Sequence, residues 1–268
     1  MKKKQRKKIQ VPASEKAASA PVAVPYGGPA SPFLLLTALV ILCSFAVFSF
    51  MRNKVYDTPV TLWADNSSKS VNKRRTHENY GQALSTAGLY KDALREFQTV
   101  LALKDDGSVP MRDLYREIGV VYFRINLIDD AISAWNTGLE HAPYDPSLLN
   151  NLSVAYLRQR RFDEAEKTIR NALAGAPYMP QALNSLGEVL MIKGNYEEAL
   201  KYFLKAIEVS PEGASRYWNA ALAFEKTGRI DKAYEYADHY LTMETNSGLK
   251  QRGISYMNHL QGLLKKRP

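Results

Sequence analysis

The sequence predicts an all-α protein in which one membrane-spanning helix leads into a solenoid of about five helix hairpins and a C-terminal capping helix. One sign is a run of 19 almost wholly apolar residues, 33–51. Another is an alanine that recurs with spacings of 38, 34, 34 and 34 residues, at Ala93, Ala131, Ala165, Ala199 and Ala233. A small residue also stands twelve positions before each alanine, at Gly81, Gly119, Ser153, Gly187 and Ala221. Such a period is typical of stacked helix hairpins.

Composition and charge exclude several classes of protein. The chain has 268 residues, of which 46% are hydrophobic and 24% are charged, as in an ordinary folded protein. Much of the net charge of +9 lies in residues 1–16, where seven basic residues and one glutamate leave +3 for the rest. The folded part is therefore nearly balanced, and we expect no nucleic-acid partner.

The N-terminal elements are a tail and a membrane helix. Residues 1–32 are basic at the tip and then rich in proline and alanine, which predicts a disordered tail. The tip either sets topology and solubility or is attracted to anionic lipid headgroups. Residues 33–51 are long enough to span a bilayer. A cleaved signal peptide is the alternative, but Arg52-Asn53-Lys54 follows the run where a small-residue cleavage site would stand.

Flanking charges predict the orientation of this helix. The basic cluster from Lys2 to Lys8 favours a cytoplasmic N-terminus, whereas Arg52 and Lys54 favour the reverse. We expect a single-pass protein of the cell (inner) membrane with a cytoplasmic N-terminus and repeats on the periplasmic or other non-cytoplasmic side. The lone cysteine, Cys43, allows no intramolecular disulfide.

Beyond the membrane helix, the repeats follow one plan. Residues 52–73 are expected to form a junction and a covering helix, with Trp63 over the open end of the first repeat. Residues 247–268 are expected to form a capping helix and a basic tail. The expected repeats between them are 74–107, 112–145, 146–179, 180–213 and 214–246. The unit from Pro180 to Pro211 shows the plan best, because both of its helices carry an apolar stripe at helical spacing.

The plan has a steric cause. Small residues let the two helices of a hairpin approach closely where they cross, while large residues one turn away fill the sides. Prolines lack an amide donor and end three of the second helices, at Pro143, Pro177 and Pro211. The 38-residue spacing is explained by four extra residues in the loop 104–110, where an insertion costs little.

These positions resemble the tetratricopeptide repeat family over about Arg74 to Met243. The resemblance implies a right-handed superhelix whose first helices line a concave groove and whose second helices form the convex back. It also implies a protein or peptide ligand in that groove.

A second resemblance concerns the stretch directly after the membrane helix, RNKVYDTPVTLWADNSSKSVNKRRTHENYGQAL. It is similar to the junction in membrane glycosyltransferase-like proteins that end in tetratricopeptide repeats, among them the transmembrane O-mannosyltransferases. This likeness implies repeats on the non-cytoplasmic side. The multi-span catalytic portion of those proteins is absent here, so transferase activity does not carry over.

The sequence shows no pattern of a catalytic, metal or cofactor site, and we expect no catalytic residue, metal, cofactor or enzymatic activity. The histidines are scattered without metal-ligand spacing, at His77, His141, His239 and His259. Acidic pairs open three second helices, where negative charge complements the helix dipole, at Asp129-Asp130, Asp163-Glu164 and Glu197-Glu198.

The groove is the candidate binding surface. Asn79, Asn151 and Asn219 stand two positions before the small residue of repeats one, three and five. In the tetratricopeptide family such asparagines form a ladder that binds an extended peptide backbone; a solvated or helix-to-helix hydrogen-bonding role is the alternative. The other candidate groove residues are Gln82, Arg116, Val120, Arg124, Asn150, Val154, Arg158, Asn184, Glu188, Trp218 and Leu222.

Aromatic and basic residues of the repeats each have two interpretations. Trp218 is either a peptide anchor or a residue that packs on the preceding repeat. Trp135 is expected in the core. The turn that holds Arg158, Arg160 and Arg161 either binds a carboxylate or phosphate or is simply solvated.

The leading hypothesis is a membrane-anchored scaffold or adaptor that binds proteins or peptides in its groove, for an envelope-assembly, secretion or glycan-export system. Two alternatives stay open. One is a chaperone-like binder of unfolded chains near a translocon. The other is an accessory subunit of a separately encoded membrane glycosyltransferase.

Overall fold

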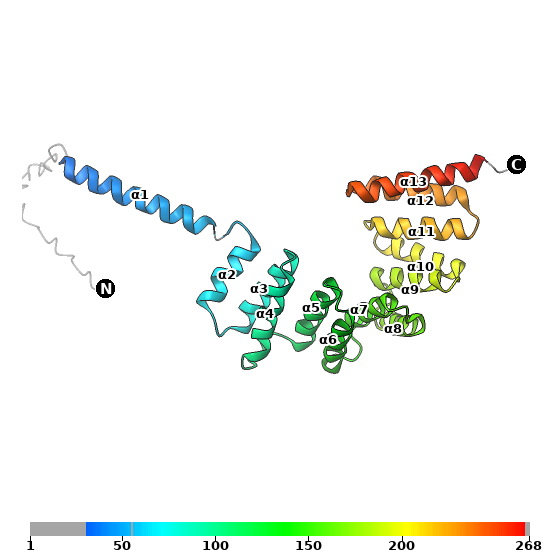
Figure 1. Ribbon diagram of the computed structural model, residues 1–268, viewed down its shortest axis with the longest axis horizontal. Coiled ribbons are helices and arrows are strands. Elements are labelled where there is room, and N and C mark those ends of the chain that lie inside the picture. Colours follow the sequence, from blue (N-terminus) through cyan, green and yellow to red (C-terminus); the bar gives the residue numbers. More distant parts are fainter. Residues whose placement is uncertain (1–30, 55, 266–268) are drawn as a thin grey trace, which may run out of the picture. The chain divides into compact units, whose positions relative to one another are not determined.

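The computed structural model describes residues 31–54 and 56–265, and all regular structure among them is helical. It divides into two compact units, 1–53 and 54–268. The first holds all but the last residue of α1 (Pro32–Lys54), a helix long and apolar enough to cross a membrane (Figure 1). The helix extends past the apolar run and includes Arg52-Asn53-Lys54. Nearly all of the predicted basic tail lies outside the described residues.

The second unit begins with α2 (Pro59–Lys69), which packs on the next helix. Thr58 caps α2: its hydroxyl accepts a hydrogen bond from the Thr61 amide (3.1 Å), and the Thr61 hydroxyl accepts one from the Thr58 amide (3.2 Å). Pro59 occupies the first helical turn, where no amide donor is needed. The junction therefore contains a helix, and it covers the start of the repeats.

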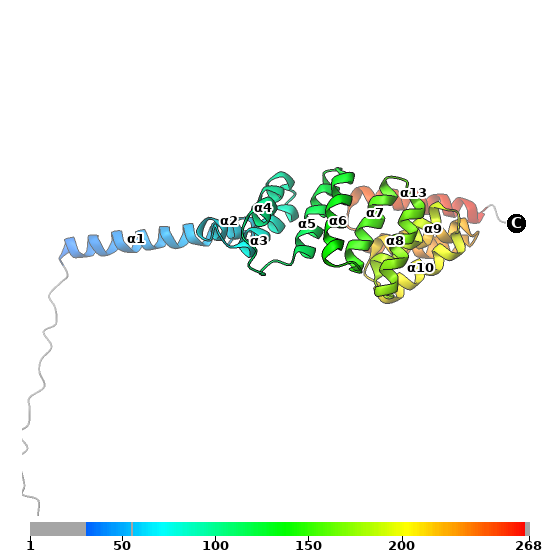
Figure 2. The same cartoon turned by 90° about the horizontal axis from the view of Figure 1, so that it is seen from below.

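Five helix hairpins follow, and each packs on the next in chain order (Figures 1 and 2). The hairpins are α3 (Arg74–Thr86) with α4 (Tyr90–Ala102), α5 (Met111–Arg124) with α6 (Ile128–His141), α7 (Pro146–Arg158) with α8 (Phe162–Gly175), α9 (Pro180–Ile192) with α10 (Tyr196–Val209), and α11 (Ala214–Lys226) with α12 (Ile230–Met243). The last element described, α13 (Ser247–Lys265), packs on α12.

The crossing point of each hairpin shows matched side-chain volumes. A methyl group added at Gly81, Gly119 or Gly187 would come within 2.2–2.5 Å of the aromatic ring opposite. Each of these rings stands sixteen positions after its glycine, and the pairs are Gly81–Phe97, Gly119–Trp135 and Gly187–Phe203. The same two repeat positions hold Ser153 with Ile169 and Ala221 with Ala237, so a residue larger than glycine is matched there with a residue smaller than an aromatic ring. Trp135 is in the core as expected, at 2% exposure.

The turn inside each hairpin repeats one backbone conformation. One residue per turn has a positive φ, and these residues are Gly88, Asn126, Arg160, Gly194 and Gly228. Glycine adopts this left-handed conformation at no steric cost, and asparagine tolerates it better than most residues. Arg160 is the exception, with a φ of 60°.

The insertion between the first two repeats is held in place. Arg74, at 2% exposure, donates from Nε to the Val100 carbonyl oxygen (3.1 Å) and forms an ion pair with Asp105. Asp105 in turn accepts a hydrogen bond from the Gly107 amide (3.1 Å). The longer loop is therefore tied to the first hairpin by a buried guanidinium.

Candidate functional site

The stack curves toward its first helices. The first helices of consecutive repeats contact one another at every step from α3 to α11, whereas the described residues show no comparable contact between consecutive second helices. Elements on the inside of a bend lie closer together than those on the outside. The first helices therefore line the concave face, which we call the groove.

At the start of the groove lies a cavity of about 480 Å³ between α2 and α3, which we call the N-terminal pocket. Asn79 and Gln82 supply amide groups to its wall, and Trp63 supplies an indole ring. The remaining lining residues are Thr58, Pro59, Val60, Ala83, Thr86 and Ala87. The Asn79 side chain makes no hydrogen bond within residues 31–54 and 56–265, so its amide is available to a ligand.

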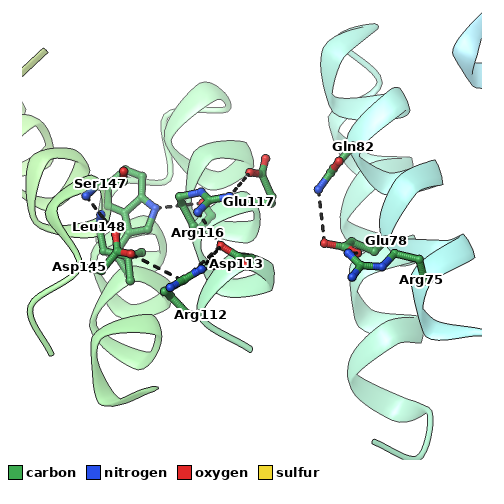
Figure 3. Close-up of polar contacts among 11 residues, drawn as sticks. Arg75, Glu78, Gln82, Arg112, Asp113, Arg116, Glu117, Asp145, Ser147 and Leu148 are labelled. Carbon is green, nitrogen blue, oxygen red and sulfur yellow. Dashed lines mark hydrogen bonds and ion pairs between the residues drawn. The ribbon is translucent and has the colours of Figure 1, made fainter. Parts of the chain in front are cut away.

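Fixed charges occupy the next part of the groove (Figure 3). On α3, the Glu78 carboxylate accepts hydrogen bonds from Arg75 (2.8 Å) and Gln82 (3.4 Å). Glu78 is itself buried, and Gln82 connects it to the wall of the N-terminal pocket, while the Arg75 side chain is exposed.

On α5, Asp113 lies between two arginines, Arg112 (3.2 Å) and Arg116 (2.6 Å). Partial burial alone would raise the pKa of Asp113, but the two guanidiniums hold that pKa below its usual range. Arg112 also reaches Asp145 (3.5 Å), and Arg116 reaches Glu117 (3.4 Å). These two arginines are thus paired within the protein.

The middle of the groove, on α5 and α7, has open binding groups. Val120 and Val154 stand one helical turn before Arg124 and Arg158, so each pair lies on one helix face. The Asn151 side chain has no hydrogen-bond partner in the described part of the chain and is only partly buried. Apolar, amide and basic groups therefore lie together here.

The groove of repeats four and five is closed by its own side chains. Glu188 Oε1 accepts hydrogen bonds from the amides of Asn184 (2.7 Å) and Asn219 (2.9 Å), and Asn219 also donates to Asn184 Oδ1 (3.1 Å). Burial raises the pKa of Glu188 above its ordinary value. Of the three aligned asparagines, Asn219 therefore takes the helix-to-helix role, whereas Asn79 and Asn151 do not.

Two predicted groove residues are placed differently from expectation. Asn150 is buried at 8% exposure, and its Oδ1 accepts a hydrogen bond from Ser185 on α9 (3.1 Å), so its side chain does not face a ligand. Trp218 packs between Tyr240 and Tyr256, with both ring centroids 5.0 Å away, and these tyrosines belong to α12 and α13. The tryptophan thus packs on the following helices, not on the preceding repeat, because α13 lies over its outer side.

A smaller cavity of about 200 Å³ ends the groove beside Trp218. It is lined by Ser215, Trp218, Tyr240, Glu244, Leu249 and Arg252. Leu222 is partly buried one turn beyond Trp218 on α11.

The acidic pairs and His77 have structural surroundings. Each pair lies in the first turn of its helix, α6, α8 or α10, where it meets the positive end of the helix dipole. His77 is buried and contacts Glu96 (2.7 Å) and the Val71 carbonyl oxygen (3.0 Å). Within the described residues no group of three metal-ligating side chains comes together.

Comparisons with known proteins agree with this architecture. A family model described as tetratricopeptide repeat matches residues 80–146, 150–214 and 193–246. The sequence matches no curated protein.

Solved structures show the fold. PilF of Pseudomonas aeruginosa is 19% identical, covers 72% of this chain and 85% of its own, and has a TM-score of 0.62. Yeast Tom70 is 16% identical over 77% of this chain and 43% of its own, with a TM-score of 0.64. YrrB, described as a TPR protein with an unusual peptide-binding site, is 19% identical over 72% of this chain and 97% of its own, with a TM-score of 0.50.

Proposed function

The chain belongs to the tetratricopeptide repeat family, and on this premise we propose that it is a membrane-anchored scaffold or adaptor that binds a segment of a partner protein in its groove. The proposal rests chiefly on the N-terminal pocket. This cavity of about 480 Å³ combines apolar walls with the Asn79 amide, which has no partner among the described residues, as a site for an extended peptide requires. An amide both donates to and accepts from a peptide backbone, while the apolar walls receive a side chain.

The anchor in this proposal is α1, which is long and apolar enough to span a bilayer. Thr58, which lines the N-terminal pocket, follows the last residue of α1 by four positions in the sequence. The pocket therefore belongs to the membrane-proximal part of the chain, which favours a partner that is itself at the membrane. An envelope-assembly, secretion or glycan-export system of the inner membrane would supply such partners.

The fixed charges favour a defined partner over a chaperone-like binder of unfolded chains. Arg75 with Glu78, and Asp113 with its two arginines, hold charges of both signs in set positions along the groove. A segment whose polar groups do not match these paired side chains loses hydrogen bonds with them, so the surface is selective. A binder of unrelated unfolded chains would need a more uniform apolar surface.

The test fills the N-terminal pocket. The full-length protein, solubilised in mild detergent, is used to capture its partner, and Ala83→Trp is compared with the wild type. Ala83 lines the pocket, so the added indole occupies the space of a ligand side chain. Lys201→Trp is the matched control, because it adds the same side chain on α10, outside the groove.

We expect Ala83→Trp to lose the partner while Lys201→Trp retains it, with both variants folded by circular dichroism. If both variants capture the partner equally well, the N-terminal pocket does not bind it. Asn79→Ala and Asn151→Ala should each weaken capture. Asn219 is unsuitable for this test because its replacement also disrupts the Glu188 cluster.

The proposed orientation has its own test. With a cytoplasmic N-terminus, the repeats lie in the periplasm or its equivalent, so protease added to intact spheroplasts should cleave the exposed loop around Asp106. Cleavage only after lysis would place the repeats in the cytoplasm and contradict the proposed side. The result leaves the binding proposal unaffected.

A further inference from the structure

Two arginines at the ends of neighbouring groove helices have no carboxylate partner among the residues that the structure describes. Arg124 is the last residue of α5 and Arg158 is the last residue of α7, one 34-residue repeat apart. Both are exposed, and neither forms an ion pair within residues 31–54 and 56–265. The other groove arginines described above, Arg75, Arg112 and Arg116, all have carboxylates within 4.0 Å.

We propose that Arg124 and Arg158, together with Arg160, form the site at which the groove recognises an acidic segment of its partner. This inference rests on the proposed function, since it names the chemistry of the segment that the groove binds. Its first support is that these guanidiniums have no carboxylate partner in the described part of the chain, whereas Arg75, Arg112 and Arg116 are each paired with one.

The Arg158 side chain is held in position for such a role. Its guanidinium carbon lies 5.4 Å from the centroid of the Phe123 ring, on α5. Phe123 directly precedes Arg124, so the contact brings the Arg158 guanidinium to the last turn of the neighbouring helix. A guanidinium stacked on a ring keeps the N–H donors at its edge available, and it loses less freedom when a carboxylate binds.

Arg160 supplies an independent observation. It occupies the left-handed turn position that glycine fills in three of the other repeats and asparagine in the fourth, with a φ of 60°. Side chains such as that of arginine disfavour this conformation. The Arg160 side chain forms no ion pair or hydrogen bond in the described part of the chain that would offset the strain. Strained residues are concentrated at functional sites. Binding of a ligand by Arg160, the third basic group, would explain why an arginine stands at this turn position.

Two nearby acidic groups are engaged with other residues. Asp129, in the first turn of α6, accepts a hydrogen bond from Gln159 (2.6 Å), the residue between Arg158 and Arg160. Glu164 forms an ion pair with Arg161, which therefore differs from its neighbours in the same turn.

The geometry indicates the form of the ligand. Arginine binds carboxylates through paired hydrogen bonds, and the side chains one turn earlier, Val120 and Val154, offer an apolar floor. Packed helices lie about 8–10 Å apart, and an extended peptide advances about 3.3 Å per residue. Two acidic residues about three positions apart would thus reach Arg124 and Arg158, with the Asn151 amide free to contact the backbone between them.

The test measures binding of a fluorescent probe peptide to the full-length protein in detergent. The probe is a glycine-serine peptide with one valine and two glutamates three positions apart, and the control peptide has glutamines in their place. The variants are the double change Arg124→Gln with Arg158→Gln, and the single change Arg160→Gly. Lys226→Gln is the matched control, because Lys226 is the last residue of α11, the equivalent place in repeat five.

We expect the glutamate probe to bind at least tenfold more tightly than the glutamine probe. The double variant should lose this preference, and Lys226→Gln should change the Kd less than twofold. Arg160→Gly should weaken binding several-fold yet raise the midpoint of thermal unfolding by about 2–4 °C, since glycine relieves the strained turn.

Equal binding of the two probes, or an unchanged preference in the double variant, would overturn the inference. Tighter binding of glycerol phosphate than of the glutamate probe, lost in the double variant, would also overturn it, because the site would then be one for lipid headgroups. Ala83→Trp tests the proposed function, and Arg124→Gln with Arg158→Gln tests the acidic site. If only Ala83→Trp abolishes partner capture, the proposed function is supported and the acidic site alone is contradicted.

Discussion

The close contact between Gly187 and Phe203 makes a sharp prediction about the repeat plan. In Gly187→Ala, the added methyl group would lie 2.4 Å from Phe203 Cε1 and 2.6 Å from Cδ1. Carbon atoms in contact settle at about 3.5–4.0 Å, so the ring must move by about 1 Å. Phe203 is 1% exposed, and packed neighbours surround it.

The expected magnitude is a balance of two effects. Overpacking of a well-filled core costs about 1–3 kcal/mol, whereas alanine in place of glycine within a helix gains about 1 kcal/mol. We expect a net loss of about 1 kcal/mol in the free energy of unfolding, which lowers the thermal midpoint by about 2–4 °C. Gly175→Ala is the matched control, because its nearest contact is an ordinary 3.6 Å to Pro146 and the change should be neutral or stabilising.

A double variant tests the volume rule directly. Gly187→Ser with Phe203→Ile copies the pair that repeat three already uses, Ser153 and Ile169. Thermal unfolding of the full-length chain in detergent, followed by circular dichroism, should show the double variant at least about 1 kcal/mol more stable than the sum of the single changes predicts. Additive effects, or a stabilising Gly187→Ala, would refute the argument from close packing.

Three further predictions concern single side chains. Arg74→Met should destabilise the protein by about 2 kcal/mol in chemical denaturation, because the buried Val100 carbonyl oxygen loses its side-chain donor; no loss would show that the insertion loop is not tied by this residue. Trp218→Ala should cost about 3 kcal/mol and expose α13 to limited proteolysis, since it removes the ring that packs against Tyr256; unchanged protection would contradict this role. The raised pKa of Glu188 means that the folded state binds its proton more tightly than the unfolded state does. Wild-type stability should therefore fall as pH rises from about 4.3 through the raised value, and Glu188→Gln should gain on the wild type over that range; parallel pH profiles of unfolding would count against it.

The helical architecture could be predicted from the sequence because each repeat carries the same spacing of small and large residues. Small residues at the helix crossings, such as Gly119, and the large residues sixteen positions later belong to one hairpin, so local spacing fixes their contact. The covering and capping helices follow for the same reason, since the ends of a solenoid need cover. The junction's likeness to membrane glycosyltransferase-like proteins remains a prediction.

The candidate site could be predicted only in part, because it depends on how one repeat is rotated against the next. Asn150 occupies the same repeat position as Arg116, yet Ser185 of the following repeat covers it. Arg74 resembles a solvated helix-end charge until the inserted loop folds back onto it. The N-terminal pocket depends on the placement of α2, whose sequence lies outside the repeat period.

The most direct test of the central claim, that the groove binds a partner segment, is site-specific photo-crosslinking in living cells. A photoreactive amino acid replaces Asn151 in the groove or, separately, Lys201 on the second helix of repeat four. We predict that the Asn151 position forms a discrete crosslinked species with one partner and that the Lys201 position does not. Crosslinks of equal yield to the same partner from Lys201, or none from Asn151 while Lys201 reacts, would contradict the account.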